Sequence, residues 1–240
     1  MKGLFIINPS SGKQINQGKA IQTITELLRD GVIDEATVFY TKAKDDAKNR
    51  TIQASKEDYD FVVAVGGDGT VNEVVAGLYI TGSKMPMAIM PSGTTNDFAT
   101  SVGIVPTVIG LYYLIKDFNV VPTDIGCFNE KDYFLNVAAG GILSEVAHNV
   151  SIESKTMLGK TAYITSGMKT IAEKGFKTTR LLFEIDGVKE EIDVYFFILA
   201  NSKSVGGFSK ICIDAKINDG SMDFGAVESF VSNAQAAGQT

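Results

Sequence analysis

The sequence contains one histidine and two cysteines among its 240 residues, and this scarcity limits the chemistry it can carry. A lone histidine, His148, argues against a histidine metal site and against a serine–histidine triad. No CxxC pair is present, and Cys127 and Cys212 each lie in an apolar, strand-like stretch. We therefore expect two buried thiols in a reducing compartment.

Long apolar runs and an excess of positive charge are also missing. The longest apolar run, Val194–Ala200, is far shorter than the roughly 20 residues that a membrane-spanning helix needs. The formal net charge is −6 and no basic stripe with interleaved aromatic residues occurs, which argues against nucleic acid as the main partner. The N-terminus lacks a small-residue cleavage site, so we predict a first strand there and no secretory signal.

The sequence does contain a strand–loop–helix stretch at residues 61–75. Phe61–Val65 is a short, valine-rich apolar run that predicts a buried strand. Three glycines follow in the loop Gly66–Thr70, and apolar residues then recur at helical spacing. Bare backbone amides in front of a helix can approach a phosphate closely. Asp68 adds a carboxylate to this loop, and a hard cation such as Mg²⁺ would reconcile it with a bound anion.

Two interpretations of this loop are open. Asp68 and Thr70 could simply cap a helix after a tight turn. The buried strand in front of the loop, and Asn72 and Glu73 directly after it, favour phosphate binding instead. Two better-known phosphate motifs are absent, because GxGxxG would need glycine in place of Asn72 and no GxxxxGK[ST] occurs.

Similar strand–loop–helix units stand on both sides of this stretch. The predicted strands are residues 4–7, 36–40, 61–65 and 87–90, and the predicted helices include 15–28, 45–57 and 106–116. Polar loops follow the first and last strands at residues 8–13 and 91–99. Because an open parallel sheet brings the loops at its carboxyl ends to one crevice, we expect these loops to form a single site.

Three of these loops resemble motifs of the catalytic domain of the diacylglycerol kinase family. They are Asn-Pro-x-Ser-Gly at residues 8–12, Gly-Gly-Asp-Gly-Thr at 66–70 and Pro-x-Gly-Thr-x-Asn-Asp-Phe-Ala at 91–99. The family usually has glycine where Thr95 stands. The glycine loop is also shared with NAD kinases and, more loosely, with phosphofructokinases. The resemblance implies an ATP-dependent, Mg²⁺-requiring lipid kinase that is cytoplasmic and acts at the inner face of the membrane.

The resemblance also implies roles for individual residues. Asp68, Asp97 and Asp124 would organise Mg²⁺ and its waters, although Asp97 could instead cap a helix and Asp124 could be a turn residue. The nucleotide-binding residues implied are Asn8, Pro9, Ser10, Ser11, Gly12, Thr41, Gly66, Gly67, Asp68, Gly69, Thr70, Asn72, Glu73 and Thr94. A structural Mg²⁺ site would use Asp219 and the carbonyls of Lys216 and Ser221, a stretch that turn chemistry alone also explains.

The second half of the sequence has a different pattern of predicted strands and helices. The predicted strands are residues 120–128, 133–138, 179–185 and 192–200, and the predicted helices are 143–150 and 156–175. Strands without regular crossover helices indicate a mainly β domain. The expected fold class is therefore α/β: an open parallel sheet flanked by helices in residues 1–124, and a mainly β, sandwich-like domain in residues 125–240.

Residues 155–180 form a basic stretch in a protein whose formal net charge is −6. Its six basic side chains are those of Lys155, Lys160, Lys169, Lys174, Lys177 and Arg180. A solvated helix face explains such a stretch, and so does a patch that holds the protein on an anionic bilayer.

The end of the sequence departs from the family. Relatives continue with an Asp-Gly-Glu motif whose glutamate is the proposed general base, whereas Asp186-Gly187 is followed here by Val188. A truncated chain and a relative without that catalyst are both compatible with this. An NAD kinase-like enzyme and a non-catalytic nucleotide-binding regulatory protein remain alternatives, and a homodimer is left open.

Overall fold

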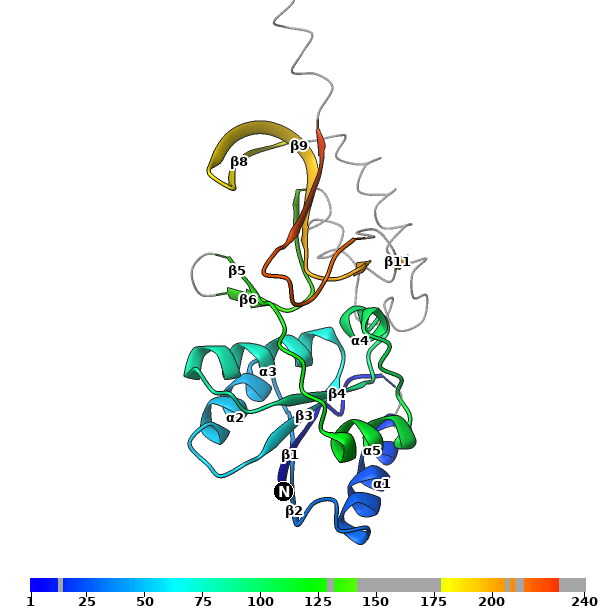
Figure 1. Cartoon of the computed structure of the whole chain (residues 1–240). Coiled ribbons are helices and arrows are strands. Elements are labelled where there is room, and N and C mark those ends of the chain that lie inside the picture. Colours follow the sequence, from blue (N-terminus) through cyan, green and yellow to red (C-terminus); the bar gives the residue numbers. More distant parts are fainter. Residues whose placement is uncertain (13–14, 129–131, 142–177, 206–207, 210–213, 229–240) are drawn as a thin grey trace, which may run out of the picture. The chain divides into compact units, whose positions relative to one another are not determined.

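The computed structural model describes residues 1–12, 15–128, 132–141, 178–205, 208–209 and 214–228 (Figure 1). The helices expected at 143–150 and 156–175, the five lysines of the basic stretch, His148 and Cys212 lie outside these residues. The chain packs as two compact units: Met1–Asn136 with Asn201–Ser221, and Val137–Ala200 with Met222–Thr240.

The first unit therefore takes in two segments, 125–136 and 201–221, that the sequence assigned to the C-terminal part. Hydrogen bonds between distant backbone groups explain this grouping. The amide of Asp124 donates to the carbonyl of Ile217 at 2.7 Å, and the amide of Asn201 donates to the carbonyl of Asn136 at 2.8 Å.

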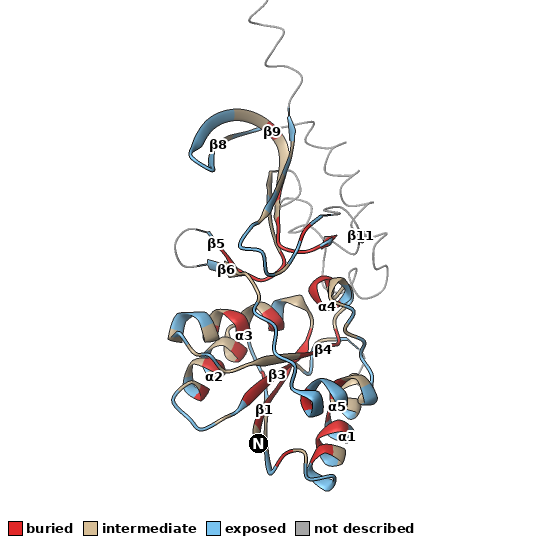
Figure 2. Cartoon of the chain, viewed as in Figure 1, coloured by how far each residue is buried: buried red, intermediate tan, exposed pale blue. Residues whose placement is uncertain are grey.

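A four-stranded parallel sheet lies at the centre of the first unit, in the order β2-β1-β3-β4. Its strands are β1 (Lys2–Ile7), β2 (Glu35–Tyr40), β3 (Phe61–Gly66) and β4 (Met87–Pro91). Every residue of β3 is buried (Figure 2), as expected for an interior strand that has a covered surface on both faces. The four strands predicted from the apolar runs are all present.

Helices cover both faces of this sheet because alternate strand residues point to opposite sides. On one face Phe5, Ile7 and Val63 pack with buried residues of α1 (Ile15–Arg29) and α5 (Val108–Asp117). On the other face Leu4 and Ile6 pack with buried residues of α2 (Asp46–Ala54) and α3 (Asp68–Thr81). A short helix, α4 (Asp97–Ser101), follows β4.

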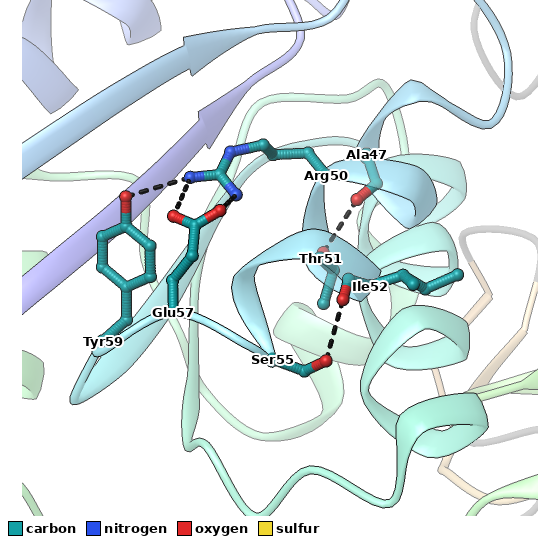
Figure 3. Close-up of polar contacts among 7 residues, drawn as sticks. All are labelled: Ala47, Arg50, Thr51, Ile52, Ser55, Glu57 and Tyr59. Atoms are coloured by element: carbon teal, nitrogen blue, oxygen red, sulfur yellow. Dashed lines mark hydrogen bonds and ion pairs between the residues drawn. The ribbon is translucent and has the colours of Figure 1, made fainter.

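A polar cluster links α2 to the segment that follows it (Figure 3). Arg50 forms two hydrogen bonds to the carboxylate of Glu57, at 2.8 and 3.0 Å, and a third to the hydroxyl of Tyr59 at 2.9 Å. The hydroxyl of Thr51 donates to the carbonyl of Ala47 within the helix. The guanidinium therefore joins the end of α2 to the segment that leads into β3.

The second unit contains an antiparallel sheet. Its strands are β7 (Val137–Gly141), β8 (Thr179–Ile185), β9 (Val188–Ala200) and β12 (Asp223–Glu228), with β9 paired to all three others. Asp186 and Gly187, both at positive φ, form the two-residue turn between β8 and β9 that such a hairpin favours. The expected α/β class, with a parallel sheet first and a mainly β part after it, is confirmed.

Four details differ from the sequence predictions. Only β5 (Gly126–Phe128) forms within the strand expected at 120–128, because the chain before it bonds to the segment around Ile217. The strand expected at 133–138 is split into β6 (Asp132–Phe134) and β7. Cys127 is exposed, so its predicted burial was wrong: it lies in a two-stranded hairpin that leaves both Cys127 and its neighbour Phe128 uncovered. Two short paired strands, β10 (Ser204–Val205) and β11 (Phe208–Ser209), were not anticipated.

Candidate nucleotide-binding and catalytic site

The three motif loops converge at the carboxyl end of the parallel sheet. β1 and β3 are neighbours, and the chain leaves them toward opposite edges of the sheet, which is where doubly wound folds bind ligands. The side-chain amide of Asn8, after β1, donates to the hydroxyl of Thr70, after β3, at 3.0 Å. The amide of Ser92, after β4, donates to the carbonyl of Gly66 at 2.8 Å.

Glycine is required where these loops touch. Gly12 has a φ of +67°, and a Cβ built there would lie 1.8 Å from the carbonyl oxygen of Ser92. A Cβ on Gly93 would lie 2.6 Å from the Cα of Gly67. The loops therefore pack backbone against backbone, and a larger residue at either position has to push them apart.

The N-terminus of α3 opens at this convergence. Gly67 precedes the helix in an extended conformation and supplies no side-chain cap to the first-turn amides. Uncapped amides at the N-terminus of a 14-residue helix carry partial positive charge and suit a phosphate group. This geometry matches the phosphate-binding interpretation of residues 66–70.

Asp68 is the first residue of α3, and donors from the third loop surround its carboxylate. The hydroxyl of Thr95 donates to Oδ2 of Asp68 at 3.1 Å, and the backbone amides of Asp97 and Phe98 hydrogen-bond to the same carboxylate. Burial, followed by the negative charge of Asp97, nevertheless raises the pKa of Asp68 above its ordinary value. A cation bound beside these two carboxylates would favour the ionised form of Asp68 and so oppose both effects.

Asp97 is buried and belongs to a polar network that sequence reasoning missed. The hydroxyl of Ser204 donates to Oδ1 of Asp97 at 2.9 Å, and the hydroxyl of Ser101 accepts from the amide of Ser204 at 3.0 Å. Ser202, also fully buried, bonds to the side chains of Ser101 and Asn136. The only signal in the sequence was the polar run Asn201–Ser204 directly after the apolar end of β9.

Asp124 lies against the loop that the family resemblance assigned to a structural metal. Its Oδ2 accepts a hydrogen bond from the amide of Gly220 at 2.8 Å, while Nδ2 of Asn201 donates to its carbonyl at 2.7 Å. Within the loop, Oδ1 of Asp219 accepts from the amide of Ser221 at 3.1 Å, which forms an Asx turn. The two predicted acidic residues, Asp124 and Asp219, are thus brought to one loop, and Lys216 and Ser221 lie exposed on it.

Several residues expected to bind nucleotide have partners within the protein. Asn72 accepts from the amide of Leu135 at 3.1 Å. The carboxylate of Glu73 accepts from the amides of Asp45 and Ala47, both at 3.1 Å, and so satisfies the start of α2. Both residues therefore hold neighbouring segments in place, and their contact with nucleotide stays a prediction.

The remaining predicted residues sit at the edges of the convergence. Thr41 follows β2 and is 8% exposed, with its amide donating to the carbonyl of Ile7 at 3.0 Å. Pro9 and Ser10 are exposed after β1, and Thr94 is exposed in the loop after β4. Ser11 and Gly69 complete the loops, and the side chain of Ser11 lies next to Gly67.

Carboxylates, hydroxyls and amides make up the donor set of this site, and these oxygen ligands are the ones Mg²⁺ prefers. Within the described residues, no group of three or more histidine, cysteine, aspartate or glutamate side chains is arranged to hold a metal ion directly. A Mg²⁺ ion bound here would therefore keep part of its water shell, as Mg²⁺ usually does in proteins.

Comparisons with known proteins agree with this architecture. Residues 2–128 match the family model described as the diacylglycerol kinase catalytic domain, and residues 136–236 match the YegS C-terminal NAD kinase beta sandwich-like domain. A diacylglycerol kinase of Bacillus subtilis (strain 168) is 36% identical over 91% of this chain and 71% of its own length. One from Staphylococcus haemolyticus is 33% identical over 90% of this chain and 64% of its own length.

A solved structure shows the same fold. The crystal structure of a diacylglycerol kinase from Bacillus anthracis (strain Sterne) superposes with a TM-score of 0.76 at 27% identity, covering 98% of this chain and 76% of that one. Fold, loop geometry and relatives together make this protein a kinase. Within that class, the chain belongs to the diacylglycerol kinase catalytic domain family.

Among the described residues, no helix combines the length and the apolar character that crossing a membrane demands.

Proposed function

We propose that this kinase transfers the terminal phosphoryl group of ATP to a lipid hydroxyl, with diacylglycerol as the acceptor, in a Mg²⁺-dependent reaction. The observation that carries the proposal is the convergence of three motif loops on the uncapped N-terminus of α3. Relatives that bear the name diacylglycerol kinase support the choice of acceptor.

The loops would bind the nucleotide phosphates. Gly12, Gly67 and Gly93 have no side chains and pack closely against neighbouring loops. Their bare backbone leaves amides that phosphate oxygens can approach. The N-terminus of α3 adds partial positive charge, and Thr94 is exposed on the same loop as Gly93. Phosphoryl transfer needs mainly positioning and charge stabilisation of this kind.

The acidic residues would hold Mg²⁺ and its waters. Asp97 lies close enough to Asp68 for its negative charge to raise the pKa of Asp68. Asp124 is hydrogen-bonded to the loop at 216–221. Bound Mg²⁺ would neutralise charge that develops on the phosphate oxygens. Asp219, with the carbonyls of Lys216 and Ser221, would hold a second, structural Mg²⁺.

The proposal places the protein at the inner face of the membrane, because its substrate stays in the bilayer. Peripheral binding through basic side chains adds about 1 kcal/mol for each cation near an anionic surface. Binding to vesicles with and without anionic lipid, at two salt concentrations, tests this part separately.

The main experiment measures transfer of labelled phosphate from ATP to diacylglycerol in mixed micelles, with and without Mg²⁺. Asp68→Ala should lower kcat by roughly 100-fold or more, since it removes charge at the reacting phosphates. Asp117→Ala, at the exposed end of α5, is the matched control and should retain wild-type activity. Equal rates for the wild type and Asp68→Ala would overturn the assignment of Asp68.

A panel of acceptors separates the remaining alternatives. Phosphorylation of NAD and of no lipid would make the protein an NAD kinase-like enzyme. Saturable ATP binding without phosphate transfer to any acceptor would favour a regulatory nucleotide-binding protein.

A further inference from the structure

Thr95 lies in the loop after β4 and contacts the central carboxylate of the site. Its hydroxyl donates to Oδ2 of Asp68 at 3.1 Å, across 27 residues of sequence. A residue without a hydroxyl or another donor at position 95 could not make this hydrogen bond.

The surrounding loop fixes the backbone of Thr95. Two hydrogen bonds join the residues on either side of Thr94 and Thr95: the amide of Gly93 donates to Oδ1 of Asn96 at 2.7 Å, and Nδ2 of Asn96 donates to the carbonyl of Gly93 at 2.8 Å. Asn96 itself is in the left-handed region, with a φ of 50°. Because a β-branched side chain has few rotamers, a fixed backbone also fixes the direction of the threonine hydroxyl.

The donors around Asp68 determine what its carboxylate can still accept. Thr95 and the amides of Asp97 and Phe98 supply three hydrogen bonds, and an ionised carboxylate has about four lone-pair sites. Every one of these donors is uncharged, so the carboxylate keeps its negative charge while its orientation is restricted. A lysine or arginine at position 95 would restrict it as well but would cancel the charge that a cation needs.

We propose that Thr95 is a positioning residue that orients the Asp68 carboxylate toward Mg²⁺-bound nucleotide. This inference rests on the proposed function, because it assigns Thr95 to the same reaction. Thr95 acts through Asp68 and is not itself assigned to touch the substrate.

Three substitutions at this position test the role of the hydroxyl. Thr95→Val keeps the shape and removes the donor, Thr95→Ser keeps the donor, and Thr95→Gly removes the whole side chain. Loss of a hydrogen bond to a charged group predicts a decrease in kcat of roughly tenfold or more for Thr95→Val, with the KM for lipid unchanged. Thr95→Ser should stay within about threefold of the wild type, given the same hydrogen bond.

The matched control is Thr100→Val, the same change at an exposed position of α4. Thermal unfolding of each variant shows whether a loss of activity reflects loss of fold. Equal kcat values for the wild type and Thr95→Val would overturn the proposal, and so would an equal loss in Thr95→Ser and Thr95→Val.

A double-mutant cycle tests whether Thr95 acts through Asp68. In an Asp68→Asn background, Thr95→Val should cause little further loss, because the carboxylate it positions is already gone. If Thr95→Val lowers the residual rate by the same factor as in the wild type, the two residues act independently and the proposal fails.

ATP binding measured by calorimetry tests the role of Thr95 without relying on lipid phosphorylation. Mg²⁺ should strengthen ATP binding by the wild type and Thr95→Ser, and strengthen it several-fold less in Thr95→Val. This pattern without phosphate transfer to any lipid would refute the proposed function and support the role of Thr95. Mg²⁺ stimulation that is equal in all variants would refute the role of Thr95, whatever the acceptor.

Discussion

Glu57, after the end of α2, and Asp68, at the start of α3, are carboxylates of the same unit in opposite surroundings. Glu57 is 44% exposed and receives two hydrogen bonds from Arg50, which lowers its pKa below the ordinary 4.5 (Figure 3). Asp68 receives only uncharged donors, and burial raises its pKa above the ordinary 3.8. In the first region a partner of opposite sign stabilises the charge, whereas in the second burial and a neighbouring negative charge destabilise it.

This difference indicates how the unit divides its tasks. Interactions that stabilise the fold lie around α2 and in the two cores, whereas the loops at the carboxyl end of the sheet tolerate close backbone contacts and unfavourable charge. Strain and perturbed pKa values of this kind concentrate at functional sites.

The largest expected effect on activity comes from separating the loops that meet near Asp68. In Gly93→Ala, the new Cβ would lie 2.6 Å from Gly67 and 2.9 Å from Oδ1 of Asn96, so the loops must separate. A misplacement of about 1 Å can cost 100-fold in rate, and we expect a loss of that order in kcat/KM for phosphate transfer. Gly18→Ala, where a Cβ meets nothing within 4 Å, should keep wild-type activity. Similar rates in both variants would contradict the proposed loop packing.

A second effect concerns the unfavourable charge of Asp68. A raised folded-state pKa means that the stability linked to this group is present below about pH 3.8 and is lost as pH rises through the folded pKa. In EDTA at pH 7, Asp68→Asn should therefore unfold at a higher temperature than the wild type, and the gap should close on acidification. Calorimetric scans between pH 3.5 and 7 measure the gap. A variant that is less stable than the wild type at pH 7 would show that Asp68 supports the fold.

The smallest effect, of opposite sign, belongs to Glu57. Its lowered pKa means that its stabilisation is present above about pH 4.5 and disappears as pH falls through the folded pKa. Glu57→Gln should lower the free energy of unfolding at pH 7 by less than about 1 kcal/mol, since the Glu57 carboxylate is exposed and its interaction with Arg50 is screened by salt. Denaturant titrations at low and high salt check this, and a loss that persists at pH 3 would assign the effect to packing.

The sequence predicted the elements that local pattern determines. The all-buried β3, the glycine loop after it and the alternation of strand and helix follow from short apolar runs and glycine positions. The convergence of the loops followed from the rule for parallel sheets, and the contacts of Asn8 with Thr70 and of Ser92 with Gly66 agree with it.

Contacts between distant residues could not be predicted in this way. The hydrogen bond from Ser204 to Asp97 spans 107 residues, and nothing in the local sequence pairs the motif residue Asp97 with the polar run that contains Ser204. Likewise, the strand expected at 120–128 fails where Asp124 bonds to Ile217, and Glu73 is engaged by the start of α2. The assignment of individual residues to nucleotide and metal stays a prediction for the experiments above.

The first unit is built from two separate pieces of chain, Met1–Asn136 and Asn201–Ser221, and this has a consequence for folding. During synthesis the parallel sheet can form once residues 2–91 have emerged, because all four of its strands lie within that range. The buried partners of Asp97 and Asp124 come only after residues 137–200 have been made, and closing so long a loop adds an entropic cost. We therefore expect the sheet to form early and the acidic residues to reach their final positions in a later, slower step.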